Sequence, residues 1–233
     1  MEKDVAKLFQ DYDRNFTKLY GMLKDELPKR LTLFNIRLRL ALDIQVAFKG
    51  EVSLTKTKSV RDTYVLLVRL MESWNAYEAL FNYVKDTKKY ANTNSSISKA
   101  YSEAFLTEIG SIQFLRESLD NLRQQFISND RFKKDFTQFL QRMIDDEHIG
   151  ASLTTSCKKF IDCFEKGKNI SPVEMIALIY AERNMYYHNG AAAKMGMSYK
   201  NRQYLLKTFT EGFHKHILLL ITKIIEKEYF EKK

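Results

Sequence analysis

The chain has 233 residues, of which 45% are hydrophobic and 29% charged, with only eight glycines and two prolines. This composition excludes a disordered chain, and the shortage of Gly and Pro argues against an all-β fold, which needs frequent turns. Lysine and arginine number 38 against 29 acidic residues, and the net charge of +9 suits contact with a polyanion such as nucleic acid. The longest apolar runs are far shorter than the roughly 18 residues of a membrane span, and no secretory signal is recognised. We therefore expect a cytoplasmic protein that does not enter a membrane.

Hydrophobic periodicity predicts that the chain is all-α. Apolar residues recur with the three- and four-residue spacing of amphipathic helices from 5 to 23 and from 31 to 48. Pro28 separates these two helices and Gly50 ends the second, so residues 1–50 are expected to form an N-terminal helical hairpin. Further helices are predicted over residues 60–89, 97–127, 132–143, 153–164, 171–189 and 198–229.

The best-marked helix start is Ser171-Pro172-Val173-Glu174. Serine can accept from first-turn amides, proline suits the first helical position, and a glutamate three residues after the serine completes a capping box. Asn189-Gly190 suits the end of this helix, because glycine readily adopts the left-handed conformation. Since no repeat or flexible linker interrupts the pattern, we expect one all-α domain over residues 1–233.

Several polar clusters are predicted to be structural. Cys157 and Cys163 lie about 120° apart on a helix, so they cannot bridge and should be small buried residues. The acidic run 145–147 is expected to be a solvated bend. His214 and His216, about 160° apart on their helix, cannot share a metal and are expected to be surface or lightly buried residues. The sequence thus predicts no metal site and no cofactor.

Polar side chains gather at the end of the helix that begins near Ser171, after turns that are apolar on all sides. On a regular helix Arg183 and His188 lie about 140° apart, and the arc between them holds Tyr187 and Asn184. Histidine can transfer a proton near neutral pH, and arginine offers a forked charge that suits phosphate. Together they could serve cleavage of RNA by its own 2′-hydroxyl, which demands no metal.

The order of these residues, Arg183 followed by the polar Asn184 and then by His188, resembles the signature of the HEPN superfamily. Its members are small α-helical bundles with an Arg and a His separated by a few residues on one helix. An earlier segment, 69–80, is similar to an early HEPN helix in its aromatic and acidic positions.

The resemblance covers about residues 58–90 and 171–230. It implies a HEPN-like bundle over residues 58–230, with inserted helices at about 97–165 and the N-terminal hairpin as an addition.

The resemblance also implies a homodimer in which the two helices that carry Arg and His face each other and form one metal-independent ribonuclease site. By this carry-over, His188 would handle the proton, Arg183 would hold the scissile phosphate and Asn184 would orient one of them. RNA as partner, a role in defence, abortive infection or toxicity, and a protein regulator or antitoxin are implied as well. One HEPN subset has a tyrosine two residues after the His that an antitoxin modifies, but Gly190 stands there in this chain.

A second hypothesis is a catalytically inactive helical module that binds a protein or a nucleic acid. Such a module could bury Arg183 and His188 in internal pairs, whereas a nuclease must leave them open in a cleft. Two supporting residues have alternative roles. Glu78 faces the predicted core and either orients Arg183 or ties two helices together, and Tyr187 either stacks on a base or fills the core.

Overall fold

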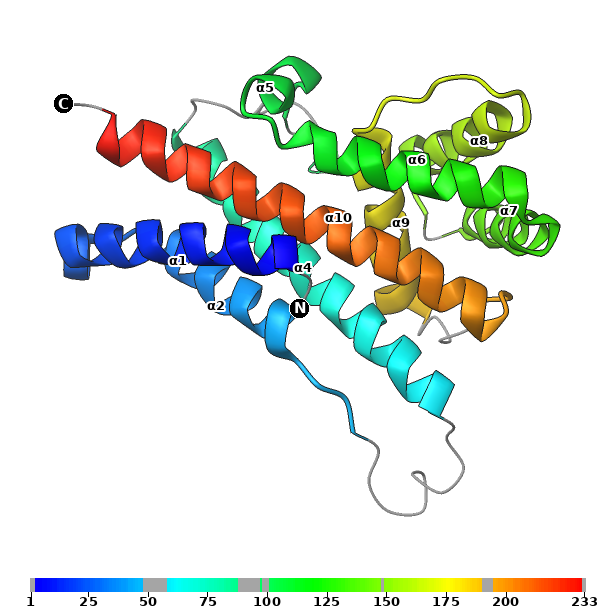
Figure 1. Ribbon diagram of the computed structural model, residues 1–233, viewed down its shortest axis with the longest axis horizontal. Helices are drawn as coiled ribbons and strands as arrows, with labels where there is room; N and C mark the ends of the chain where they lie inside the picture. Colours follow the sequence, from blue (N-terminus) through cyan, green and yellow to red (C-terminus); the bar gives the residue numbers. More distant parts are fainter. Residues whose placement is uncertain are drawn as a thin grey trace.

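The structure, a computed structural model, describes residues 3–47, 58–87, 97, 101–147, 149–189 and 195–231, with only the backbone of His188 and Asn189. All regular elements in these ranges are helical, which confirms the all-α fold (Figure 1). None of the described helices has the length and apolar character needed to cross a lipid bilayer. The helices are α1 (Lys3–Leu23), η1 (Lys24–Glu26), α2 (Lys29–Asp43), α4 (Lys58–Thr87), α5 (Glu103–Glu108), α6 (Ile112–Ser128), α7 (Asp130–Ile144), α8 (Ala151–Glu165), α9 (Glu174–Asn189), α10 (Tyr199–Ile225) and η3 (Glu226–Phe230).

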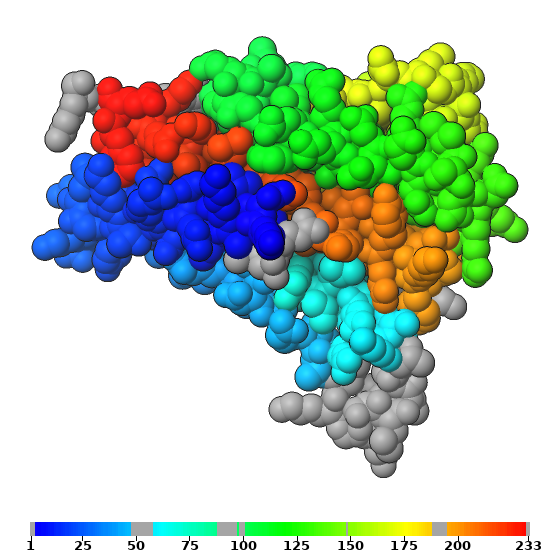
Figure 2. All heavy atoms as spheres, in the orientation of Figure 1, coloured from blue at the N-terminus to red at the C-terminus, as the bar shows by residue number. Residues whose placement is uncertain are grey.

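Helix α10 runs through the middle of the molecule and contacts α1, α4, α6 and α9. It is buried on most of its circumference because neighbours cover it from several sides. Figure 2 shows the N-terminal helices, in blue, and the α5–α8 segment, in green to yellow, on opposite sides of α10. Buried side chains from α1 to α10 form one continuous hydrophobic cluster.

The N-terminal helices α1 and α2 meet through side chains, as a helical hairpin should. The Tyr12 hydroxyl donates to Asn35 at 3.0 Å, and the Tyr12 ring meets Phe34 edge-on. The second helix ends at Asp43, earlier than the predicted residue 48, and Ile44 is extended. The Ile44 carbonyl oxygen accepts from Nε of Arg69 in α4. A tertiary hydrogen bond therefore satisfies this carbonyl in place of a helical one. The predicted stop at Gly50 lies outside the described residues.

The predicted helix over 97–127 is wrong as a single element, because α5 and α6 are separate helices. Gly110 lies between them with a φ of 80°, in the left-handed region that glycine adopts most easily. Ser102 caps the first of the two by accepting from the amide of Phe105. The apolar periodicity of the sequence thus continues across the turn at Gly110, although the helix itself is interrupted there.

Helix α9 positions the residues of chemical interest. The Ser171 hydroxyl accepts from the amide of Val173, and the helix begins at Glu174, close to the predicted start. The Glu174 carboxylate accepts from Ser156 and Lys159 of α8. The following turns, residues 175–179, are buried on all sides, as their apolar sequence predicted. The polar end of α9 therefore emerges directly from the core.

Candidate functional site

Two neighbours on its own helix hold the Arg183 guanidinium near the end of α9. Its Nη1 donates to Oδ1 of Asn184 at 3.1 Å, and its central carbon lies 4.6 Å from the centroid of the Tyr187 ring. Its Nε is buried without a hydrogen-bond partner among the described residues. The structure thus brings together three of the four residues that share the predicted arc. It also leaves one donor of a charged group unsatisfied, which is costly unless a ligand or water meets it.

Tyr187 links the end of α9 to α4. Its hydroxyl accepts from Nδ2 of Asn75 at 3.3 Å. Because 48% of its surface is exposed, Tyr187 does not fill the core. An exposed aromatic ring beside a guanidinium is suited to stack on a nucleic-acid base.

His188 belongs to the last turn of α9 by its backbone, while its side chain lies outside the described part of the chain. That the His188 side chain lies near Arg183 therefore stays a prediction from helix geometry. The adjoining Asn184 is buried, with its oxygen turned to the Arg183 guanidinium. This contact holds the guanidinium against Asn184, while the role in catalysis that the resemblance implies for Asn184 stays a prediction.

Glu78 lies on α4, one turn after Asn75, and is only half-buried. Within the described ranges its carboxylate forms neither a hydrogen bond nor an ion pair, so no contact supports either an orienting role toward Arg183 or a tie between two helices.

The fully buried carboxylate near the site is instead Glu182, which the sequence analysis did not single out. Both Glu182 and Arg202 of α10 are 0% exposed, and two nitrogens of the guanidinium contact the two carboxylate oxygens. The Arg202 guanidinium also lies 5.1 Å from the centroid of Phe139. A signal was present in the sequence, because Glu182 directly follows an all-round apolar run and so needs a buried cation. This pair fixes α9 to α10 one residue before Arg183.

His214 and His216 are buried, and the expectation of surface or lightly buried histidines is wrong. The two side chains leave α10 in different directions, so they contact different neighbouring segments. Nε2 of His214 lies 2.6 Å from the hydroxyl of Ser73 in α4, and Nδ1 of His216 lies 3.3 Å from the carbonyl oxygen of Ser111, which precedes α6. Burial, reinforced by the charge of Arg69, lowers the pKa of His214 to about 3. Burial lowers the pKa of His216 to about 4, although its hydrogen bond to Ser111 opposes the shift.

The contact between Ser73 and His214 is not arranged as a nucleophile and its base. The Ser73 hydroxyl donates to the carbonyl oxygen of Arg69 at 2.6 Å, so it is left to accept from the imidazole. Ser73 is also completely buried, out of reach of a substrate. The pair therefore serves to join α4 to α10.

Lowering the pH from 7 to 5 is expected to reduce the free energy of unfolding by about 2 kcal/mol for each of these histidines. The unfolded imidazole has a pKa of about 6.5, so the unfolded chain binds a proton that the folded chain excludes. The loss begins below about pH 6.5 and continues until the pH nears the lowered pKa values of about 3 for His214 and about 4 for His216. Urea unfolding across this pH range measures it. The control His216→Gln should show a shallower dependence, and an unchanged slope would contradict the assignment.

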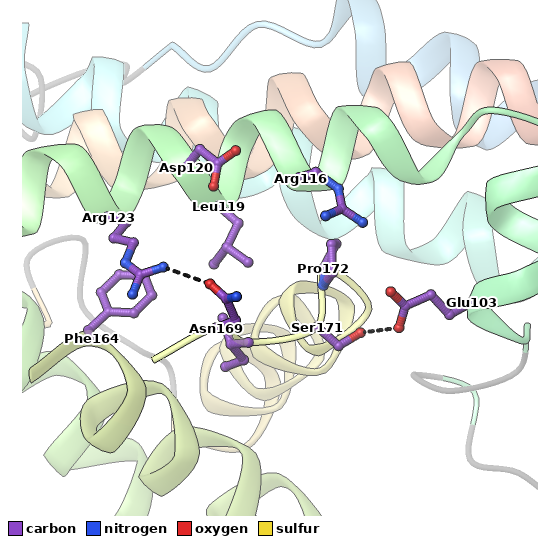
Figure 3. Close-up of a pocket in the computed structure, with 10 residues that line it drawn as sticks. Glu103, Arg116, Leu119, Asp120, Arg123, Phe164, Asn169, Ser171 and Pro172 are labelled. Atoms are coloured by element: carbon purple, nitrogen blue, oxygen red, sulfur yellow. Dashed lines mark hydrogen bonds between the residues drawn. The ribbon is translucent and has the colours of Figure 1, made fainter. Parts of the chain in front are cut away.

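A polar pocket of about 340 Å³ lies at the opposite end of α9, between α6 and the segment that precedes α9 (Figure 3). Several of its polar groups bond to one another or to the nearby backbone. Arg123 donates to the carbonyl oxygen of Lys168 at 2.9 Å, and the Ser171 hydroxyl donates to Glu103 at 2.6 Å. These contacts fix the start of α9 to α5 and α6. We therefore interpret the pocket as part of the packing between these helices.

Metal ligation finds no support in the described residues, where no group of three His, Cys, Asp or Glu side chains could hold an ion. Cys157 and Cys163 are free and buried, as predicted. Comparisons with protein-family models, with curated proteins and with solved structures find no match to this chain. Assignment of a function therefore rests on the residues of the chain itself.

Proposed function

We propose that this chain is a metal-independent endoribonuclease of HEPN type. The observation that supports the proposal most is the Arg183 guanidinium at the end of α9, which Asn184 and Tyr187 orient five residues before His188. A planar cation beside an exposed aromatic ring suits a phosphate that lies next to a base.

The reaction that fits these groups is attack by the 2′-oxygen of RNA on the adjacent phosphorus. The bond between phosphorus and the 2′-oxygen forms, the bond to the 5′-oxygen of the next nucleotide breaks, and a 2′,3′-cyclic phosphate results. His188 handles the proton that leaves the 2′-hydroxyl or the one that the 5′-oxygen gains. Arg183 stabilises the charge that builds on the phosphoryl oxygens, and Asn184 fixes its orientation.

A homodimer would complete the site. Two α9 ends that face each other supply two imidazoles, so that one can accept a proton while the other donates one. The net charge of +9 assists RNA capture, and Lys133 and Lys134 of α7 are among the exposed cations. The setting we propose is cytoplasmic, with RNA cleavage in a defence, abortive-infection or toxin role restrained by a protein regulator.

A second candidate is the inactive helical binding module for a protein or nucleic-acid partner. One observation favours it, since Arg183 is already bonded within its own helix and Asn184 is buried. In this case the same residues would stabilise the end of α9 and would not act on a substrate.

Incubation of cellular RNA with the purified protein in excess EDTA separates the two candidates. Cleavage that leaves 2′,3′-cyclic phosphate ends supports the nuclease. Intact RNA, together with retardation of RNA on a native gel, supports the binding module and contradicts the proposed reaction.

A further inference from the structure

The outer face of α2 carries an apolar stripe that no described part of the chain covers. Leu33, Ile36 and Leu40 are 46%, 56% and 39% exposed. The opposite face of the same helix buries Leu31, Phe34, Leu38, Ala41 and Leu42 toward α4 and the core. Figure 1 shows α2 at the margin of the helical bundle, on the other side of α4 from α9. Three large apolar side chains in register on one exposed stripe are typical of a contact surface.

Charges stand at both ends of this stripe. Lys29 and Asp43 lie seven residues before and seven residues after Ile36. On a regular helix Lys29, Asp43 and the three apolar residues share an arc of about 80°.

Neither Lys29 nor Asp43 forms an ion pair in the described part of the chain, although both are exposed. The arginines of α2 differ in this respect, because each pairs with a carboxylate of a neighbouring helix. The pairs are Arg30–Asp86, Arg37–Glu72 and Arg39–Asp13. The two unpaired charges of α2 are thus the two that end the apolar stripe.

We propose that the α2 stripe binds the same stripe of a second copy of this chain, with the two helices antiparallel. A two-fold axis through Ile36 sets Ile36 against itself and Leu33 against Leu40 of the other copy, with an offset of only about 1.5 Å along the helix. The same axis sets Lys29 opposite Asp43 at each end of the contact. A single helix face is therefore complementary to itself in shape and in charge, as an isologous interface requires.

This contact is separate from the one proposed for the α9 ends and does not depend on the proposed function. Of the two orientations open to a pair of copies, the charges select one. A parallel pair would set Lys29 against Lys29 and Asp43 against Asp43, which repel.

Cysteine cross-linking tests the interface and its orientation at once. Ile36→Cys should form a disulfide-linked dimer under mild oxidation, because the axis brings the two sulfur atoms together. Leu33→Cys and Leu40→Cys should each stay uncrosslinked alone, since the antiparallel helices separate identical residues by about 9 Å and 12 Å. A mixture of these two variants should cross-link. The native Cys157 and Cys163 are buried and should not interfere.

Two results would overturn the proposal. An Ile36→Cys variant that stays monomeric on a non-reducing gel would show that the stripe does not meet its own copy. Cross-linking of Leu33→Cys alone, as readily as Ile36→Cys, would show a parallel pair. In the Ile36→Cys background, Lys29→Asp should lower the yield at low salt by several-fold, and adding Asp43→Lys should restore it, because the opposite charges then face each other again.

Discussion

Replacing His188 with alanine is expected to lower the rate of RNA cleavage by about 10²- to 10⁴-fold, the usual contribution of a general acid or base. By its backbone His188 belongs to the last turn of α9, beyond the buried turns of residues 175–179. Initial rates of cleavage in EDTA measure the effect, and thermal unfolding of the same samples checks the fold. Cleavage at the wild-type rate by the folded variant would remove His188 from the reaction.

The same assay distinguishes the parts of the Arg183 cluster. Arg183→Lys keeps the charge but loses the planar fork that bonds Asn184 and stacks on Tyr187, so we expect a rate at least about 10-fold lower. Tyr187→Phe is the matched control, because it keeps the ring under the guanidinium and removes only the hydroxyl that accepts from Asn75. Its rate should stay close to that of the wild type. Equal loss in both variants would point to general damage at the end of α9.

The helices were predictable because their apolar spacing is regular, and the errors fell where a tertiary contact or a single residue overrode it. The first helix, expected over 5–23, spans Lys3–Leu23. The second ends early, at Asp43, and the carbonyl oxygen of the next residue, Ile44, accepts from Arg69 of another helix. Local periodicity carries no information about such a contact. Gly110 was visible in the sequence, but the apolar spacing continues on both sides of it and masks the turn.

The candidate site was predictable only along one helix. The arc of Arg183, Asn184 and Tyr187 follows from helix geometry, and the structure shows these three in contact. Contacts between helices were not predictable in the same way. Arg202 is the partner of Glu182 from a different helix, and sequence spacing does not state which faces of two helices meet. The burial of His214 and His216 was not predictable for the same reason, because it depends on α4 and α6 covering opposite faces of α10.

Removing one member of the Glu182–Arg202 pair is expected to lower the free energy of unfolding by about 3–5 kcal/mol. Both side chains are 0% exposed, so Arg202→Met leaves the Glu182 carboxylate in the core without its guanidinium, and Glu182→Met removes the carboxylate that faces the Arg202 guanidinium. For a chain of this size the loss corresponds to a fall in Tm of roughly 10 °C. Calorimetry or urea unfolding measures it. Arg14→Met is the control, because Arg14 is 73% exposed in its pair with Asp11 and should change Tm little.

The double variant Glu182→Met with Arg202→Met should recover most of the lost stability, since apolar side chains of similar volume need no charge partner. A double variant as unstable as the single variants would contradict the view that the unpaired charge causes the loss. Because Glu182 directly precedes Arg183, the rate of RNA cleavage by the double variant tests whether the buried pair also affects the site. If cleavage returns with stability, the pair acts only by holding α9 against α10. If stability returns and cleavage does not, the buried charges also set the position of the Arg183 guanidinium or the field around it.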